Sequence, residues 1–214
     1  MVHLSVGYKL LELCDNITDK NAFLLGTLSP DAIMFRSGCE RSDKSTTHFC
    51  TGDEGWGFYT NYDEWEHNFF ENIEKFKGTV DRDFLFGYAS HIFADIENSR
   101  RFWTPIRLSG DETVKSAWFN DCDEMDSILL NSIHNINELW PALEAANNDK
   151  RCLPGLFTAD DNAALINKMK TEMYHNRYPN PEYAPSIFTA SAASQFIDDI
   201  AAKSTEYIKA QNKR

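Results

Sequence analysis

The segment FLFGYASHIFADI, residues 84 to 96, constrains the fold of this chain more than any other. It is apolar enough for a helix that is buried on most sides, yet it contains His91 and Asp95 four positions apart. Residues at i and i+4 project from the same face of an α-helix, so both side chains can reach one metal ion without distorting the backbone. An isolated pair of this kind is more often a buried histidine paired with a carboxylate. The rest of the sequence decides between these interpretations.

Three further residues of metal-ligand type stand in or beside apolar sequence. Asp31 follows a proline at the end of LLGTLSPD, where its alternative role is a helix cap. His48 lies in TTHF on an expected loop, and His3 lies on the apolar stripe of the first expected helix. Each of these residues is unremarkable alone. Together with His91 and Asp95 they need partners, because burying unpaired polar groups is costly. A divalent ion such as zinc partners all five, so the sequence predicts a metal cluster.

Helical periodicity recurs along the whole chain, and no stretch alternates with period two for long enough to predict a strand. We therefore expect an all-α fold in a single domain that covers residues 1–214. A polar segment, residues 36–57, is expected to be a long loop. The expected helices include residues 3–14, 21–28, 61–77 and 189–210. Another helix, capped by Asp81 or Asp83, is expected to end at Thr104 and Pro105. Two or more helices are expected between residues 112 and 147, and one more over residues 158–174.

The formal net charge of −12 limits what the chain can bind. A strongly acidic protein repels polyanions, so we expect no nucleic acid as a partner. No apolar run is long enough to span a bilayer, and the N-terminus lacks the features of a secretory signal, so we expect no stable membrane insertion. Five scattered cysteines, odd in number, are typical of reduced thiols, and we expect a cytoplasmic protein. The sequence does not fix the oligomeric state.

Four motifs in order, HLSVGYKLLEL, FLLGTLSPD, HF and FLFGYASHIFADI, resemble the zinc-dependent phospholipase C family, and in particular its intracellular clostridial-type members. This family consists of all-α metallohydrolases related to the single-strand-specific nucleases. The resemblance covers about the first half of the chain. It implies the multi-helix fold of the zinc-dependent phospholipase C type. It also implies that His3, Asp31, His48, His91 and Asp95 hold two or three zinc ions, with the aspartate of the His-x-x-x-Asp pair bridging two of them.

The resemblance extends to residues beyond these motifs. Arg101 occupies the position of a family histidine; an arginine cannot bind the metal, but it can hold a substrate phosphate. The family completes its site with a His-x-x-x-Glu pair, for which the sequence offers two candidates. One is His134 with Glu138 in HNINE, and the other is Asp121 with Asp126 in NDCDEMD, which resembles intracellular relatives. We favour Asp121 and Asp126 as metal ligands.

The expected function is that of a zinc-dependent phosphoric ester hydrolase similar to phospholipase C, acting on a small phosphoester or a phospholipid head group. In this mechanism Asp95 bridges the metals, Asp31 orients the attacking water as general base, and Arg101 neutralises the phosphate. The alternatives are a phosphomonoesterase or nuclease on the same scaffold, and a metal-stabilised binding protein without catalysis. His67 and His175 have no comparable context and are expected to be structural or surface residues.

Overall fold

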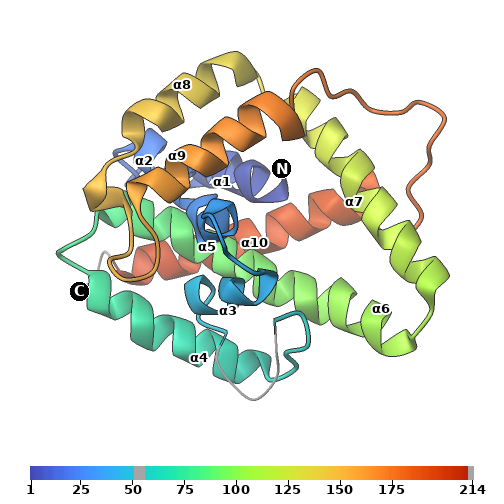
Figure 1. Cartoon of the computed structure of the whole chain (residues 1–214), viewed down its shortest axis with the longest axis horizontal. Helices are drawn as coiled ribbons and strands as arrows, with labels where there is room; N and C mark the ends of the chain where they lie inside the picture. The colour runs from blue at the N-terminus through green and yellow to red at the C-terminus, as the bar shows by residue number, and fades with distance from the viewer. Residues whose placement is uncertain (51–55, 212–214) are drawn as a thin grey trace.

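The computed structural model describes residues 1–50 and 56–211, and these residues contain helices but no β-strand, which confirms the predicted all-α class (Figure 1). The α-helices are α1 (Val2–Leu13), α2 (Lys20–Gly26), α3 (Lys44–Thr47), α4 (Tyr62–Ile73), α5 (Arg82–Asn98), α6 (Thr104–Ser109), α7 (Glu112–Ser132), α8 (Ile136–Ala146), α9 (Ala159–Lys168) and α10 (Ala190–Gln211). The 3-10 segments are η1 (Ser29–Phe35), η2 (Arg41–Asp43), η3 (Glu74–Phe76) and η5 (Asp149–Arg151), and the π segments are η4 (Ser99–Trp103) and η6 (Met169–Met173). None of the described helices combines the length and the apolar character needed to cross a bilayer.

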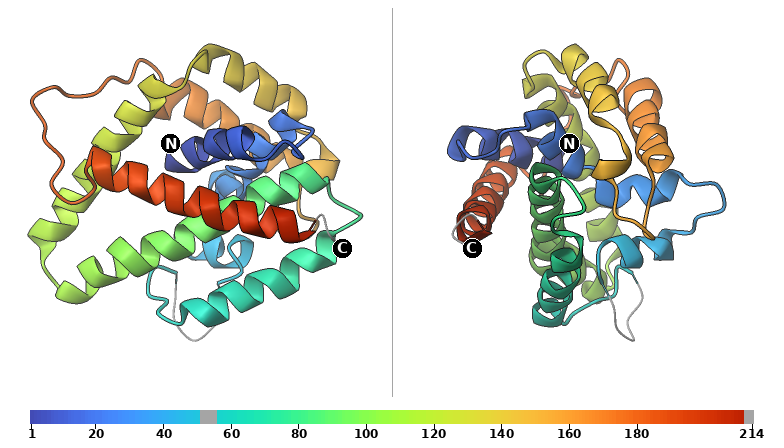
Figure 2. Two further views of the ribbon diagram at one scale, coloured as in Figure 1. Left: turned by 180° about the vertical axis from the view of Figure 1, so that it is seen from behind. Right: turned by 90° about the vertical axis from the view of Figure 1, so that its left-hand side faces the viewer.

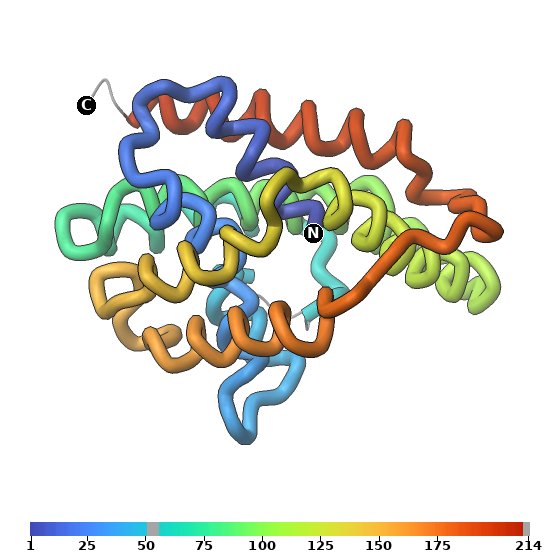
Figure 3. The backbone as a smooth tube through the Cα atoms, turned by 90° about the horizontal axis from the view of Figure 1, so that it is seen from above, coloured from blue at the N-terminus to red at the C-terminus, as the bar shows by residue number. Residues whose placement is uncertain are grey.

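Helix α5 runs through the middle of the molecule, in contact with α2, α1, α4 and α10 (Figure 1). Every residue from 83 to 94 is buried, as expected for a helix that is apolar around its whole circumference. Helices α1 and α10 pack side by side behind it (Figure 2). Seen from above, α1 and α10 form one layer, α5 lies beneath them, and α8 and α9 lie on the far side (Figure 3). The segment that carries the His-x-x-x-Asp pair is therefore the core of the fold.

Two aspartates fix the start of α5. The carboxylate of Asp81 accepts hydrogen bonds from the backbone N–H groups of Asp83 and Phe84, so Asp81 is the N-cap. The Asp83 carboxylate instead accepts hydrogen bonds from the backbone N–H groups of Thr18 and Asp19, each at 2.7 Å. Of the two residues that the sequence offered as caps, one caps α5 and the other ties α5 to the segment that leads into α2.

Helices α2 and α5 cross with their backbones in contact. A Cβ atom added to Gly87 would lie within the van der Waals radius of the Phe23 carbonyl oxygen, and one added to Gly26 would collide with the Phe84 carbonyl oxygen. Neither contact can relax by rotating a side chain, because both obstacles are backbone atoms. Glycine is therefore required on both helices at this crossing.

The middle of residues 36–57 is not the loop that we predicted, since η2 and α3 lie within it; residues 51–55 lie outside the described residues. Helix α3 is held on both sides. The Thr47 hydroxyl donates a hydrogen bond to a carbonyl oxygen of η1 at 2.8 Å, and the Trp65 indole N–H donates one to the His48 carbonyl oxygen at 2.7 Å. His48 is thus the C-cap of a short, anchored helix.

The helix end predicted at Thr104 and Pro105 is also wrong. The π segment η4 follows α5 directly and leads into α6, which ends at Gly110 with φ +67°. In a regular α-helix a proline ring clashes with the carbonyl group four residues earlier. The wider turn of a π segment moves that carbonyl group away, so the helix continues through the proline. The other expected helices are present, and residues 112–147 form α7 and α8.

The crossing of α2 and α5 gives a first prediction. Gly87→Ala should lower the free energy of unfolding by about 3 kcal/mol, because backbone atoms cannot yield to the added methyl group. Gly7→Ala is the matched control: its Cβ would meet the flexible side chain of Leu24 at 3.0 Å, and the change should cost less than about 1 kcal/mol. Urea denaturation measures both differences. Equal effects would show that the crossing does not depend on glycine.

Candidate metal centre

Five residues of metal-ligand type converge from four separate segments. His3 comes from α1, Asp31 from η1, His48 from the end of α3, and His91 and Asp95 from α5. The His91 ring contacts the other two histidine rings: the rings of His3 and His91 stack with centroids 3.7 Å apart, and His48 meets His91 edge-on. These are the five residues that the sequence predicted as ligands. The structure brings all of them together.

The tautomers of two histidines follow from their hydrogen bonds. Nδ1 of His91 lies 2.8 Å from the carbonyl oxygen of Thr27, and Nδ1 of His48 lies 2.9 Å from the carbonyl oxygen of Lys44. A carbonyl oxygen can only accept, so each Nδ1 carries a proton, and each ring in its neutral form presents the Nε2 lone pair to the cluster. The two Nε2 atoms lie 3.1 Å apart. Two lone pairs at this distance repel each other unless a proton or a metal cation lies between them.

The spacing of the donor atoms fits a zinc ion. Around Nε2 of His48 and Nε2 of His91 lie Oδ1 of Asp31, at 3.5 and 3.9 Å, and Oδ2 of Asp95, at 3.1 and 3.7 Å. Ligand atoms about 2.0 to 2.1 Å from a tetrahedral zinc ion lie about 3.3 Å from one another. The separations therefore suit Asp31, His48 and His91 as three ligands of one ion, with Asp95 beside them, and the pairing of nitrogen with carboxylate oxygen suits zinc.

Asp95 also faces a second group of donors. Its Oδ1 atom lies 3.5 Å from Nε2 of His3, whereas its Oδ2 atom faces His48 and His91. The Nδ1 atom of His3 is buried and has no hydrogen-bond partner among the described residues. A buried donor atom without a partner is rare in proteins, and a ligand is one explanation for it. The two oxygens of Asp95 thus face His3 on one side and His48 with His91 on the other.

Burial and neighbouring charges shift the pKa values in the cluster. Burial alone would raise the pKa of Asp95, but the neighbouring His91 and His48 lower it well below its usual value. Burial likewise opposes ionisation of Asp31, whereas Lys44, with its Nζ atom 2.5 Å from Oδ1 of Asp31, lowers the pKa of that carboxyl group well below the usual range. Burial lowers the pKa of His3 well below 6.5. At neutral pH both carboxylates are charged and His3 is neutral, which are the forms that bind a metal. Burial opposes protonation of His48, but its hydrogen bonds to Asp31 and Asp95 raise its pKa above 6.5.

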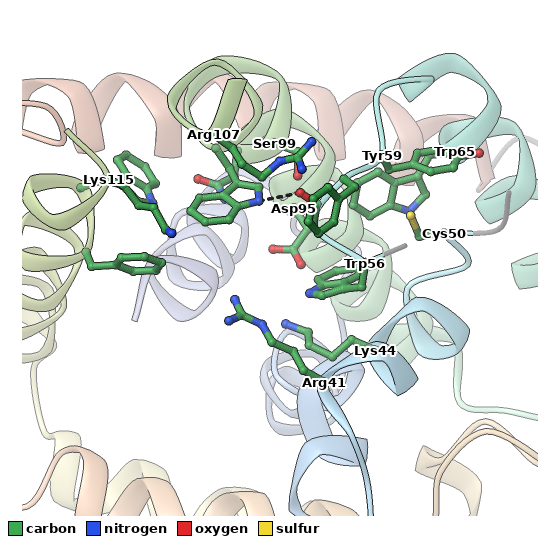
Figure 4. Close-up of a pocket in the computed structure, with 16 residues that line it drawn as sticks. Arg41, Lys44, Cys50, Trp56, Tyr59, Trp65, Asp95, Ser99, Arg107 and Lys115 are labelled. Atoms are coloured by element: carbon green, nitrogen blue, oxygen red, sulfur yellow. Dashed lines mark hydrogen bonds between the residues drawn. The ribbon is translucent and has the colours of Figure 1, made fainter. Parts of the chain in front are cut away.

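A cavity of about 580 Å³ opens beside the cluster, with Asp95 in its wall (Figure 4). The basic residues around it are Arg41, Lys44, Arg107 and Lys115, and its aromatic residues include Trp56, Trp103 and Trp118. A second cavity of about 380 Å³ lies against the cluster and is lined mainly by apolar side chains, together with His3, Asp31, His91 and Asp95. The candidate metal centre therefore lies between a basic, aromatic cavity and an apolar one.

The structure does not bring Asp121 to the cluster. Its buried carboxylate accepts hydrogen bonds from the hydroxyl group of Tyr183 at 2.6 Å and from the backbone N–H groups of Ser186, Ile187 and Phe188 at 2.5 to 3.0 Å. These four bonds use the carboxylate to anchor the segment that precedes α10. Its role is structural, and the sequence offers no means of distinguishing such a carboxylate from a ligand.

Asp126 lies closer, since it lines the apolar cavity together with His3. Its carboxylate is bound to the Met1 amine at 2.8 Å and to the Tyr174 hydroxyl group at 3.0 Å. The alternative pair is not brought to the site: His134 and Glu138 are both exposed at the start of α8. Neither pair that was predicted to complete the site faces the five converging residues with free donor atoms.

Arg101 lies in η4 with its guanidinium group bound to Glu97 and, at 2.6 Å, to Asp199. It lines neither of the two cavities beside the cluster. The structure therefore does not place it where a phosphate at the cluster would lie. His67 pairs with Glu71 on the surface of α4, and His175 is exposed, as expected.

The four basic residues of the basic, aromatic cavity were not predicted from the sequence. Lys44 carried a signal, because it lies four residues before His48 and so on the same face of a short helix. The other three come from η2, α6 and α7, and only the tertiary structure brings them together.

Comparison with family models, with curated proteins and with solved structures finds no match to this chain.

The cluster predicts that removal of metal destabilises the fold. Exhaustive chelation should lower the melting temperature by several degrees or more, because it leaves facing lone pairs and buried carboxylates without a partner. His91→Ala and Asp95→Ala should lose bound zinc almost completely, whereas His134→Ala, the control, should retain it. Scanning calorimetry and elemental analysis measure these outcomes. An unchanged melting curve after confirmed loss of metal would contradict the cluster.

The anchoring role of Asp121 gives a prediction about pH. Burial alone would raise its pKa, but the hydrogen bonds from Tyr183 and the backbone hold the pKa below the ordinary value of 3.8. A depressed carboxyl pKa stabilises the folded state above the unfolded pKa, and this stability is lost as pH falls through the folded value. Asp121→Asn should therefore cost roughly 1.5 to 3 kcal/mol at neutral pH. The difference from wild type should shrink below about pH 4.

Denaturation across this pH range tests the prediction, and elemental analysis supplies the control. The Asp121→Asn variant should keep its zinc. Loss of zinc from this variant at neutral pH, with the fold intact, would restore Asp121 as a ligand.

Proposed function

We propose that the chain is a zinc-dependent phosphoester hydrolase on an all-α scaffold of the zinc-dependent phospholipase C type. The observation that carries the proposal is the convergence of five ligand-type side chains, one of which, Asp95, also lines a cavity that contains four basic residues. A cluster of divalent metal ions alone is compatible with many kinds of hydrolase. Positive charge beside it, in a protein of net charge −12, favours an anionic ester.

The positions of the donor atoms support a ligand set. Asp31, His48 and His91 would hold one zinc ion, and Asp95, which faces both His48 and His3, would link this ion to a second one beside His3. Zinc bound at such a site acidifies water near neutral pH and neutralises charge on a phosphate oxygen. The backbone carbonyl groups that accept from Nδ1 of His48 and His91 keep the ligand nitrogens aimed at the ions.

Asp31 and Lys44 act beside the metals. Asp31 is the more exposed of the two carboxylates, at 34% against 16% for Asp95, so it is the one that can accept a hydrogen bond from an attacking water. Its lowered pKa keeps it ionised and suits it to orient the water rather than to carry a proton for long. Burial alone would lower the pKa of Lys44, but Asp31 and Asp95 raise it, so the ammonium group stays charged and can bind a phosphate oxygen.

Hydrolysis of bis(4-nitrophenyl) phosphate in the presence of zinc tests the proposal. The wild-type protein should release 4-nitrophenol, and Asp31→Asn should lower kcat per bound zinc by roughly 100-fold, the lower end of what a positioned acid–base group contributes. Asp63→Asn, which changes a fully exposed aspartate, is the matched control and should keep full activity.

The other outcomes separate the alternatives. Activity confined to 4-nitrophenyl phosphate would make the chain a phosphomonoesterase. Zinc-loaded, folded protein without activity on either ester would refute the proposed reaction and leave a metal-stabilised binding protein.

A further inference from the structure

The basic cavity has a charge opposite to that of the protein around it. Four of the described residues that line it are basic and one, Asp95, is acidic, whereas the whole chain has 33 acidic and 21 basic residues. Like charges that share a cavity repel one another, and burial beside aromatic rings strengthens the repulsion. An anion that enters the cavity relieves this repulsion.

Two of the four basic groups have no acidic partner among the described residues. Lys44 is paired with Asp31, and Lys115 with Glu112 on the surface of α7. The guanidinium group of Arg107 instead lies 3.7 Å from the centre of the Phe58 ring, and its buried Nε atom has no hydrogen-bond partner in the part of the chain that is described. Arg41 likewise forms no ion pair with a described residue and borders the same cavity (Figure 4). Toward the described residues, both guanidinium groups therefore have N–H donors available for a ligand.

The size and the position of the cavity indicate what that ligand is. Asp95 belongs to the cluster and also lines the cavity, so a group bound there is continuous with a phosphoester at the metals. A volume of about 580 Å³ is typical of sites that enclose a small molecule and exceeds what one phosphate group fills. Arginine is the residue type best suited to bidentate binding of a phosphate group.

We infer that this cavity binds a second phosphate group, so that the substrate is a small phosphoester carrying two phosphates, one at the metals and one held by Arg107 and Arg41. The inference rests on the proposed function for the reaction, but it assigns a binding site that can be measured without turnover. The aromatic walls exclude water and strengthen the ion pairs that the second phosphate forms.

Binding of alkanediol bisphosphates to the zinc-loaded protein tests the inference. Isothermal calorimetry would compare bisphosphates with spacers of two to six carbons against alkyl monophosphates of equal length; these compounds avoid the strong zinc chelation of pyrophosphate. The bisphosphate of best length should bind at least roughly tenfold more tightly than its monophosphate, as expected for added charge-assisted hydrogen bonds. This ratio should fall several-fold in Arg107→Gln and in Arg41→Gln. Lys20→Gln, which removes an exposed charge outside the cavity, should leave it unchanged.

The controls keep the outcomes distinct. Circular dichroism confirms that each variant folds, and Arg41 is exposed, so its replacement does not disturb the core. A bisphosphate preference of twofold or less, the statistical factor for two phosphates, would overturn the inference. So would an equal loss in Lys20→Gln, which would attribute the preference to overall charge. An arginine-dependent preference in a protein that hydrolyses no aryl phosphate would uphold the second-phosphate site and refute only the proposed reaction.

Discussion

The backbone contact between α2 and α5 sets the geometry on which the candidate metal centre depends. Because Gly26 and Gly87 have no Cβ, the two helices approach until the carbonyl group of Thr27, directly after α2, lies within hydrogen-bonding distance of His91. That hydrogen bond determines which nitrogen of the ring faces the other ligands. Packing and chemistry are thus coupled at one crossing. A change that separates the helices alters the position of the His91 ring relative to the other four residues as well as the stability of the fold.

Three of the five converging residues could be predicted from the sequence because each stood where a polar group needs an explanation. His91 and Asp95 interrupt an apolar helix, and His3 interrupts an apolar stripe. The basic cavity could not be predicted in the same way. Arg41, Arg107 and Lys115 lie in polar sequence where a charged residue is ordinary, and only tertiary structure brings them to one place. The helices were predicted well where the period was regular, and poorly around α3 and at the proline after η4.

The chain as a whole is acidic, whereas the cavity beside the candidate metal centre is lined by basic residues. The excess of carboxylates keeps the outside acidic, which opposes binding of long polyanions. The basic groups of the cavity act over short distances, because solvent ions screen charges separated by more than about 10 Å. A small anion that reaches the opening meets a local positive field, whereas a polymer meets the acidic surface first. The arrangement selects by size as well as by charge.

The π segment η4 lies between α5 and α6 and changes the direction in which the side chains of α6 point relative to those of α5. Asp95, Ser99, Trp103 and Arg107 all line the basic cavity, and they follow one another at intervals of four residues. In a regular α-helix each such interval advances the side chain by about 40°, so four residues in this series spread over about a third of the circumference. The wider π turn offsets part of this advance and keeps the series on one side. The segment acts as an inserted residue: without it, α6 would be rotated by about 100°, and Arg107 would face away from the cavity while Asp95 stayed in place.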